Sequence, residues 1–366
     1  MKKKLLFQPT GKKNAGALLL CCFQKKRYPG FAMVLALLIN GFAFAQQQPH
    51  YTQYIINNYI INPAITGIEN YTDVKLSHRH QWVGLQDAPV TTYLTIHKPI
   101  GKKDDRVSAT SYPMPDENPR GKSYWADYEA AKPHHGIGLK IINDRAGPLN
   151  RFGGYLSYAY HLGISAKTSI AAGFEAGLRN ISLNRSMLNF GSANPIDPSV
   201  YNSSEINQLK PDFGAGVWIY SSHYFIGLSV QQMIPQKIYY SDDQLKADAS
   251  INTPHFFATA GYRVFLNDDI SALPSVMVKY IQPVSPQLDI NLKLQYRDLF
   301  WIGGTYRTED AFAGLMGLNI SSKFNISYAY DYTISSLNTV SKGTHEIVLG
   351  FLLGNQYGDW CPRNVW

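Results

Sequence analysis

Hydrophobic and polar residues alternate along about fourteen short segments between Tyr71 and Leu353. In residues 287–297, for example, Asp289, Asn291 and Lys293 are separated by leucine and isoleucine. Because successive side chains of a β-strand point to opposite faces, each segment has one hydrophobic and one hydrophilic face. A two-residue repeat in segments of about ten residues is typical of transmembrane β-barrels. The pattern therefore predicts an all-β protein, an outer-membrane β-barrel of about 14 antiparallel strands.

The alternation also fixes the expected strands and their register. The strands are expected at residues 70–82, 89–99, 134–143, 150–161, 167–180, 211–221, 223–232, 254–265, 271–282, 287–297, 299–307, 311–320, 323–332 and 344–353. In this register Leu292 faces lipid, and Asn291 faces a polar lumen that would tolerate an arginine. An even strand count is usual for a single-chain barrel, and it predicts that both chain ends lie on the periplasmic side.

The lengths of the connections support this order of strands. Long connections, such as 181–210, 232–253 and 333–343, follow odd-numbered strands, whereas those after even-numbered strands are mostly short. Long outer loops and short periplasmic turns are the usual asymmetry of such barrels. The insertion 101–133 follows the second strand and is the exception, so we expect it on the periplasmic side, where Tyr124–Tyr128 could pack on the rim or bind a partner.

A soluble β-sandwich also alternates, but two features favour the membrane barrel. The chain has 25 Tyr, 17 Phe and 6 Trp, and many of these lie near the expected strand ends. Aromatic rings concentrate at the two membrane interfaces of outer-membrane barrels. The predicted inner face is rich in Gly, Ser, Asn and charged residues, whereas the core of a soluble protein would be apolar.

The chain divides into four regions. Basic residues and the apolar stretch 31–45, which ends in Ala43-Phe44-Ala45, predict a signal peptide at 1–45 that is cleaved before Gln46. Residues 46–69 form an N-terminal periplasmic or plug-like segment, 70–353 the barrel, and 354–366 a C-terminal tail. The expected localisation is the Gram-negative outer membrane.

The N-terminal segment 46–69 has apolar residues at helical spacing. These residues, with one polar member, are Tyr51, Tyr54, Ile55, Asn58, Ile61 and Ile65. The spacing predicts a short helix that ends before Pro63. Two interpretations stay open: a helix packed on the end of the barrel, or a plug or docking element.

Charge and cysteine content exclude several classes of protein. The chain has 34 Lys and Arg against 26 Asp and Glu, but the leader contains eight basic and no acidic residues. The mature protein is therefore neutral, which argues against a nucleic-acid partner. Beyond the leader only Cys361 remains, so no intramolecular disulfide is expected.

No pattern for catalysis, a metal or a cofactor stands out. His78 with His80, and His134 with His135, lack a third ligand, and the chain contains no G-x-S-x-G motif. We therefore predict no enzyme activity, no metal and no cofactor. The charged residues of the expected lumen would form a paired network, a polar channel or a plug-binding wall; they are Glu175, Arg179, Asp289, Lys293, Arg297 and Arg307.

Ordered short motifs resemble the PorP/SprF family, outer-membrane proteins of the type IX secretion system of Bacteroidetes. Individually weak, they run in family order through Gln53-Tyr54, Asn62-Pro63-Ala64, Arg79, Gln81-Trp82-Val83-Gly84, Gly136-Ile137-Gly138, Asn143-Asp144, Tyr158-Ala159-Tyr160-His161, Pro211-Asp212-Phe213-Gly214, Lys279-Tyr280, Trp301, Tyr330-Asp331 and His345-Glu346. Candidate structural or partner-contact residues are Asn62, Pro63, Arg79, Gln81, Trp82, Asn143, Asp144, Asp212, Tyr330, Asp331, His345 and Glu346. The insertion 101–133 is longer than is usual in this family.

The resemblance implies a role that alternation alone does not reveal. Members serve type IX secretion or gliding as non-catalytic barrels. Expected partners are outer-membrane lipid, periplasmic and lipoprotein components of the machinery, and secreted adhesins or other cargo with C-terminal sorting domains. The alternative from another class is a passive outer-membrane channel for a small solute.

Overall fold

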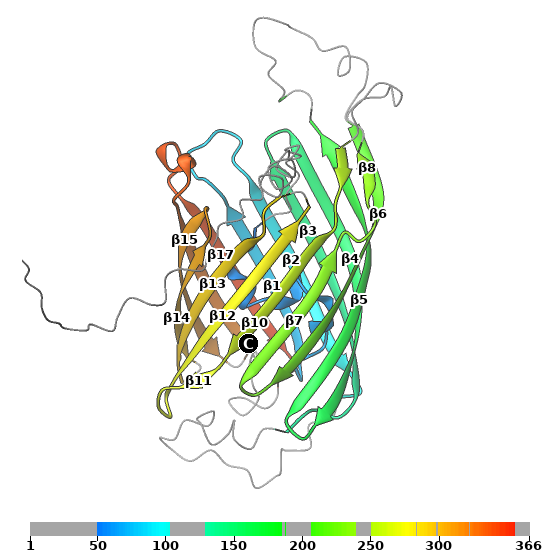
Figure 1. Ribbon diagram of the computed structural model, residues 1–366, viewed down its shortest axis with the longest axis vertical. Coiled ribbons are helices and arrows are strands. Elements are labelled where there is room, and N and C mark those ends of the chain that lie inside the picture. The colour runs from blue at the N-terminus through cyan, green and yellow to red at the C-terminus, as the bar shows by residue number, and fades with distance from the viewer. Residues whose placement is uncertain are drawn as a thin grey trace, which may run out of the picture. The chain divides into compact units, whose positions relative to one another are not determined.

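The computed structural model describes residues 50–102, 129–184, 187, 206–238, 250–282, 284–297, 299–321 and 323–355. These residues form a closed antiparallel β-barrel (Figure 1). The wall consists of β1 (Thr72–His80), β2 (Val90–Ile100), β3 (His134–Ala146), β4 (Leu149–Ser165), β5 (Thr168–Leu183), β6 (Ile206–Ser221), β7 (Tyr224–Gln231), β10 (His255–Tyr262), β11 (Val264–Phe265), β12 (Ile270–Ile281), β13 (Gln287–Tyr296), β14 (Phe300–Arg307), β15 (Ala311–Ser321), β16 (Phe324–Thr333) and β17 (Thr344–Leu353).

The wall has the predicted number of strands. β10 and β11 both pair with β12 and are two parts of one strand, so the barrel has fourteen strands. The first and last strands pair from Thr72 with Leu353 to His80 with His345, which closes the ring. A small additional hairpin, β8 (Gln236–Ile238) with β9 (Ser250–Asn252), extends the β7–β10 connection and was not predicted.

The predicted register of β13 is confirmed. Ile290 and Leu292 are 49% and 48% exposed on the outside, whereas Asp289 and Asn291 are buried on the inside. Two tyrosines on the outer wall are hydrogen-bonded to histidines, one pair near each end of the barrel. Tyr158 and His135 are 2.7 Å apart near the lower end, and Tyr328 and His345 are 2.6 Å apart near the upper end. An apolar outer wall with such rings is the usual surface of a barrel in a lipid bilayer.

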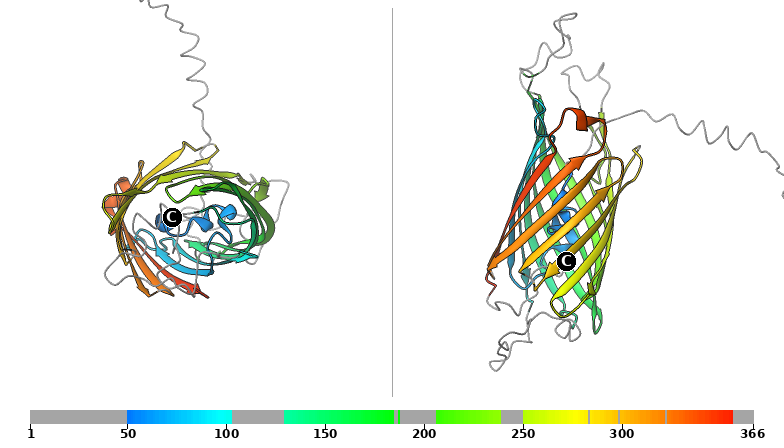
Figure 2. Two further views of the ribbon diagram at one scale, coloured as in Figure 1. Left: turned by 90° about the horizontal axis from the view of Figure 1, so that it is seen from below. Right: turned by 90° about the vertical axis from the view of Figure 1, so that its left-hand side faces the viewer.

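We call the end with the β1–β2, β3–β4 and β16–β17 connections the upper end, as drawn in Figure 1, and the opposite end the lower end. Seen from below, the N-terminal ribbon (blue) lies inside the ring of strands (Figure 2). We call residues 51–68 the plug segment. The expected helix is wrong: the segment contains only three 3-10 turns, η1 (Thr52–Ile55), η2 (Asn58–Ile60) and η3 (Pro63–Ile65).

The plug segment runs through the barrel from its upper to its lower end. Thr52 contacts Glu346 close to the upper end of β17, and Gly67 contacts His97 close to the lower end of β2. The start of β1 and the end of β17 do lie together at the lower end. His50 lies at the upper end, beside Gln81 and Trp82. Both ends of the chain lie outside the described residues, so the expectation that they share the periplasmic side stays a prediction.

No helix of the described residues is long and apolar enough to cross a membrane.

Candidate functional site: the plugged lumen

The upper part of the plug segment is held by a buried ionic cluster. Arg79 forms ion pairs with Asp331 at 2.8 Å and with Glu346 at 3.0 Å. The backbone N–H of Thr52 donates to Glu346 at 2.9 Å, and its hydroxyl donates to Asp331 at 2.6 Å. We call these four residues the upper anchor. Arg79, Asp331 and Glu346 all occupy inward-facing positions of their strands. The seam between β1 and β17 therefore also binds the plug segment.

A second arginine extends this cluster around the barrel wall. Arg307 contacts Asp289 at 3.2 Å and Asp310 at 3.1 Å, and it lies 3.8 Å from Asp331. On the neighbouring strand Asn291 is hydrogen-bonded to the phenol of Tyr54. The lumen wall therefore forms a paired network that binds the plug, which combines two of the three expected alternatives.

Asn291 and Arg297 have surroundings that differ from those expected for them. Asn291 is 3% exposed and contacts the plug, which argues against the expectation that an arginine would be tolerated there. Arg297 is not a lumen residue: it has a positive φ of 45° after β13 and pairs with Asp269 at 2.7 Å on the exposed lower surface.

The middle of the plug segment is anchored through its backbone carbonyls. The side chain of Gln231 donates to the carbonyl of Ile60 at 2.9 Å, and Ser229 donates to that of Ile61 at 2.7 Å. A backbone without regular secondary structure needs such partners when it is buried. Ile60 and Ile61 are 1% and 2% exposed, and full burial of each such side chain contributes about 1.5–3 kcal/mol.

The Asn62-Pro63 pair shapes the chain where it turns against β6 and β7. The side-chain oxygen of Asn62 accepts from the backbone N–H of Ala64 at 2.9 Å and so caps η3, whose first residue is Pro63. The amide nitrogen of Asn62 donates to the carbonyls of Val217 at 3.1 Å and Leu228 at 3.3 Å. One side chain thus fixes the local turn and also binds it to the wall.

Tyr59 reaches across the lumen from η2 to β4. Its hydroxyl lies 2.6 Å from that of Ser157. This contact joins the middle of the plug segment to β4.

Histidines surround the lower part of the plug segment, which we call the lower anchor. His161 lies 2.9 Å from the carbonyl of Thr66, and His134 lies 3.2 Å from that of Gly67. The rings of His134 and His161 are stacked at 4.5 Å, and the N–H of Gly67 donates to His97 at 3.2 Å. A Cβ on Gly136 would lie 1.8 Å from the Thr66 carbonyl oxygen, so only glycine permits this approach of backbone to backbone.

The structure brings some predicted site residues together and separates others. Arg79, Asp331 and Glu346 meet in the upper anchor. Asp144 accepts from Thr91 at 2.7 Å and pairs with Arg151 at 3.4 Å. Lumen residues also include Asp212, which accepts from Tyr155 at 2.9 Å.

The remaining candidates lie away from the plug. Gln81 and Trp82 follow the end of β1 at the upper rim, and Trp82 has a positive φ of 51°. Asn143, Tyr330 and His345 point outward from their strands, and the last two have ring centroids 5.1 Å apart. The sequence motifs alone do not show which candidate residues face the lumen. For residues within strands, the alternation of inward and outward positions does.

Several residues that hold the plug were not predicted as site residues. They include Thr52, Lys140, Ser157, His161, Ser229 and Gln231. The wall residues among them all occupy inward positions of their strands, so parity was an available signal. Which inward residue meets the plug depends on how the plug folds, and no repeat encodes this.

The described residues contain no group of three or more His, Cys, Asp or Glu side chains that could hold a metal ion. His78 and His80 point outward, and His134 and His135 lie on opposite faces of β3. Neither pair converges with a third ligand.

Comparison with known protein families supports the family resemblance of the sequence motifs. The family model of type IX secretion system membrane protein PorP/SprF matches residues 43–351. No curated protein sequence matches the chain.

Solved outer-membrane barrels are similar to the chain at low identity. One is the Ralstonia pickettii toluene transporter TbuX, with 11% identity, a TM-score of 0.45, and coverage of 81% of this chain and 92% of that one. Another is a Pseudomonas aeruginosa FadL homologue, with 9% identity, a TM-score of 0.42, and coverage of 79% and 91%.

The family and the barrel together place the protein in the outer membrane, in contact with lipid and associated with secretion machinery. The family is one of secretion system membrane proteins. The chain belongs to the PorP/SprF family of type IX secretion system membrane proteins.

Proposed function

We propose that the protein is a non-catalytic component of type IX secretion that engages exported surface proteins and the periplasmic machinery through its two rims. The observation that carries the proposal is the plug segment, which is bonded to the wall at its upper, middle and lower levels. A lumen filled in this way is suited to a docking platform rather than to an open path for solutes.

The two ends of the barrel would have different partners. The long connections at the upper end would face the cell exterior and meet exported proteins. The lower end would face the periplasm, where the insertion 101–133 follows β2; its residues 103–128 lie outside the described chain. The aromatic residues Tyr124 to Tyr128 of that insertion remain a candidate contact for a periplasmic component.

A disulfide that fixes the plug tests the proposal directly. The hydroxyl oxygens of Thr66 and Ser157 are 3.0 Å apart, so cysteines at both positions have sulfur atoms within bonding reach. The variant Thr66→Cys/Ser157→Cys, made in a Cys361→Ser background, would hold the plug in the lumen under oxidising conditions. Each single cysteine variant is the matched control.

Gene deletion, followed by return of the wild-type or the cross-linked protein, gives the readout. Deletion should remove specific large proteins from the cell surface, and the oxidised cross-linked variant should restore them as well as the single-cysteine controls do. The alternative is a passive channel for a small solute. A growth defect on one nutrient with normal secretion would support that channel and overturn the proposal.

A further inference from the structure

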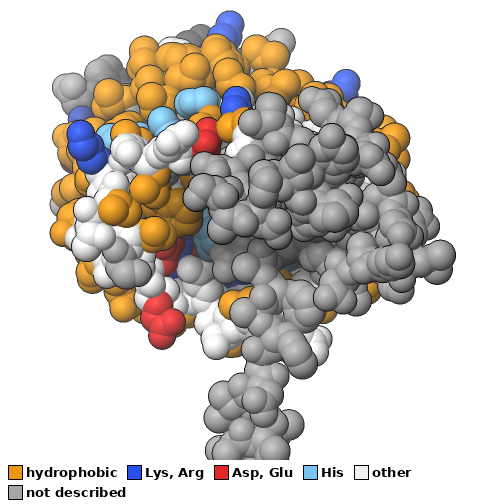
Figure 3. Space-filling view, turned by 90° about the horizontal axis from the view of Figure 1, so that it is seen from above, with side chains coloured by type: hydrophobic (Ala, Val, Ile, Leu, Met, Phe, Trp, Pro, Cys, Tyr) orange, Lys and Arg blue, Asp and Glu red, His pale blue; other side chains and the backbone are white. Residues whose placement is uncertain are grey.

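Two adjoining cavities beside the upper part of the plug segment form what we call the upper vestibule. The larger has a volume of about 930 Å³ and is lined by Trp82, Lys279 and other residues of the upper rim. The smaller, of about 40 Å³, lies against β3–β7 and includes Arg179 in its lining. Asp144 and Arg151 line both cavities, so the two are neighbours. In the view onto this end, acidic and histidine side chains lie inside a largely hydrophobic wall (Figure 3).

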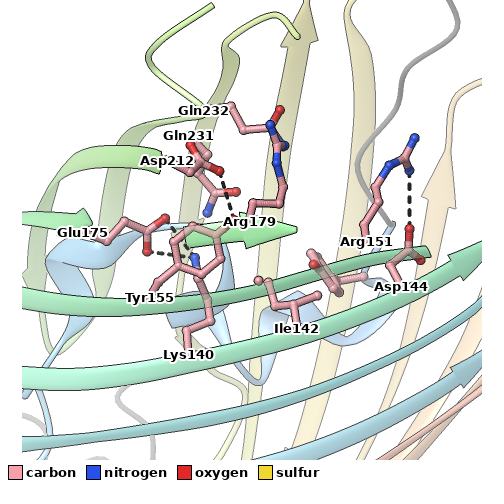
Figure 4. Close-up of a pocket in the computed structure, with 12 residues that line it drawn as sticks. Lys140, Ile142, Asp144, Arg151, Tyr155, Glu175, Arg179, Asp212, Gln231 and Gln232 are labelled. Carbon is pink, nitrogen blue, oxygen red and sulfur yellow. Dashed lines mark hydrogen bonds and ion pairs between the residues drawn. The ribbon is translucent and has the colours of Figure 1, made fainter. Parts of the chain in front are cut away.

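The carboxylates of the smaller cavity already have partners in the wall. Their contacts are Lys140 with Glu175 at 2.7 Å, Arg151 with Asp144 at 3.4 Å, and the Tyr155 hydroxyl with Asp212 at 2.9 Å (Figure 4). These acidic groups are therefore compensated by other residues of the barrel.

Arg179 is the exception in this cavity. It is 7% exposed, and it makes no ion pair or hydrogen bond with any other residue that the structure describes. In Figure 4 its side chain lies among Tyr155, Asp212 and Gln232, and no dashed line reaches its guanidinium. The side-chain oxygen of Gln232 is also buried without a partner. An amide oxygen carries no charge, so it would not neutralise the arginine.

Lys279 is a second cation of this kind, on the opposite part of the vestibule. It is 6% exposed and has no ion pair within the described chain. The nearby carboxylates of Asp289 and Asp310 are engaged by Arg307, at 3.2 and 3.1 Å. Both Arg179 and Lys279 act electrostatically on His255 of β10, which places the two cations around one region of the lumen.

A buried charge without a partner is costly, and a bound anion offsets that cost. The planar fork of a guanidinium matches a carboxylate through two parallel hydrogen bonds. The smaller cavity has room for such a group, because one water molecule needs only about 10–15 Å³ on the same measure.

We propose that the upper vestibule binds a carboxylate-bearing ligand, with one carboxylate on Arg179 in the smaller cavity and the remainder of the ligand beside Lys279 in the larger one. This ligand site is independent of the proposed role in secretion, because ligand binding is a property of the barrel alone and can be measured on the purified protein. The carboxylate could come from a small organic acid or from an acidic side chain of a polypeptide.

Titration calorimetry on the purified full-length protein in detergent tests the site with two probes, glutarate and a hexaglutamate peptide. Saturable binding of at least one probe is expected. Arg179→Gln should weaken it at least tenfold, in line with the loss of a charge-assisted contact. Lys279→Gln should weaken it about three- to tenfold, because Lys279 borders the larger cavity. Tighter binding of glutarate would identify a small solute as the source, and tighter binding of the peptide would identify a polypeptide.

The matched control is Arg297→Gln, which removes an exposed arginine at the lower end and should leave binding unchanged. Thermal unfolding provides an independent readout. Without ligand, Arg179→Gln should melt at a higher temperature than the wild type, because a buried unpaired charge is removed. Glutarate should stabilise the wild type more than chloride of equal ionic strength does. Absence of saturable binding of both probes to the wild type, or equal binding by Arg179→Gln, would overturn the proposal.

Discussion

Arg79 and Glu346 are direct cross-strand partners where the first strand of the barrel meets the last, and their side chains form an ion pair at 3.0 Å. The same carboxylate accepts the backbone N–H of Thr52 at 2.9 Å. One buried ion pair therefore joins the closure of the barrel to the docking of the plug segment. Replacing such a pair by apolar groups can be neutral, but removing one partner leaves a buried charge uncompensated.

The first prediction concerns this pair. Arg79→Ala should lower the free energy of unfolding by about 3–5 kcal/mol, because the carboxylates of Asp331 and Glu346 lose their main partner. Denaturant unfolding of the protein in detergent measures the change. Arg297→Ala is the control, since its pair with Asp269 is exposed and should contribute at most about 1 kcal/mol. Equal losses in the two variants would contradict the assigned role of the upper anchor.

The second prediction separates the two faces of β13. Leu292→Arg places a charge on the lipid face and should impair outer-membrane assembly, at a cost of about 2–4 kcal/mol near the middle of the membrane. Leu292→Met is the control and should assemble normally. Asn291→Ala should assemble but be less stable by about 1–3 kcal/mol, because the hydroxyls of Tyr54 and Thr305 lose a buried partner. Normal assembly of Leu292→Arg would refute the register.

The third prediction concerns the contact between plug and wall at Gly136. A methyl group in Gly136→Ala would meet the Thr66 carbonyl oxygen at 1.8 Å and should displace the lower part of the plug. The expected result is a several-fold higher ion conductance in planar bilayers, together with lower thermal stability. Gly314→Ala is the control, since nothing lies within 4 Å of the added group. If both variants conduct as the wild type does, Gly136 does not control the position of the plug.

The fourth prediction tests which end of the barrel faces the cell exterior. In a Cys361→Ser background, Val340→Cys lies at the upper end and Lys167→Cys at the lower end. A thiol reagent that does not cross the outer membrane should label Val340→Cys in intact cells. It should label Lys167→Cys only after permeabilisation. The opposite pattern would reverse the assignment of every connection to a side and, with it, the proposed partners of each rim.

Strand parity made the barrel predictable from the sequence. Each strand must present an apolar face to lipid and a polar face to the lumen. The alternation in β13 therefore shows that Asn291 faces the lumen and that Ile290 faces lipid. The expected strand at 344–353 coincides with β17, Thr344–Leu353. By the same alternation Glu346 belongs to the inner face of β17, and it is buried there. These properties depend on neighbouring residues along the chain and on one external condition, the apolar bilayer.

The interior was decided by tertiary structure. Residues 51–68 have apolar residues at helical spacing, yet they form only short 3-10 turns. The carbonyls of Ile60 and Ile61 accept hydrogen bonds from Gln231 and Ser229 of the wall, where a continuous helix would have used its own N–H groups. The return of this segment through the lumen also places residue 50 at the end of the barrel opposite the start of β1. Alternation identifies which residues point inward, but not which of them meet across the lumen. That depends on contacts between residues up to 294 positions apart, as between Thr52 and Glu346.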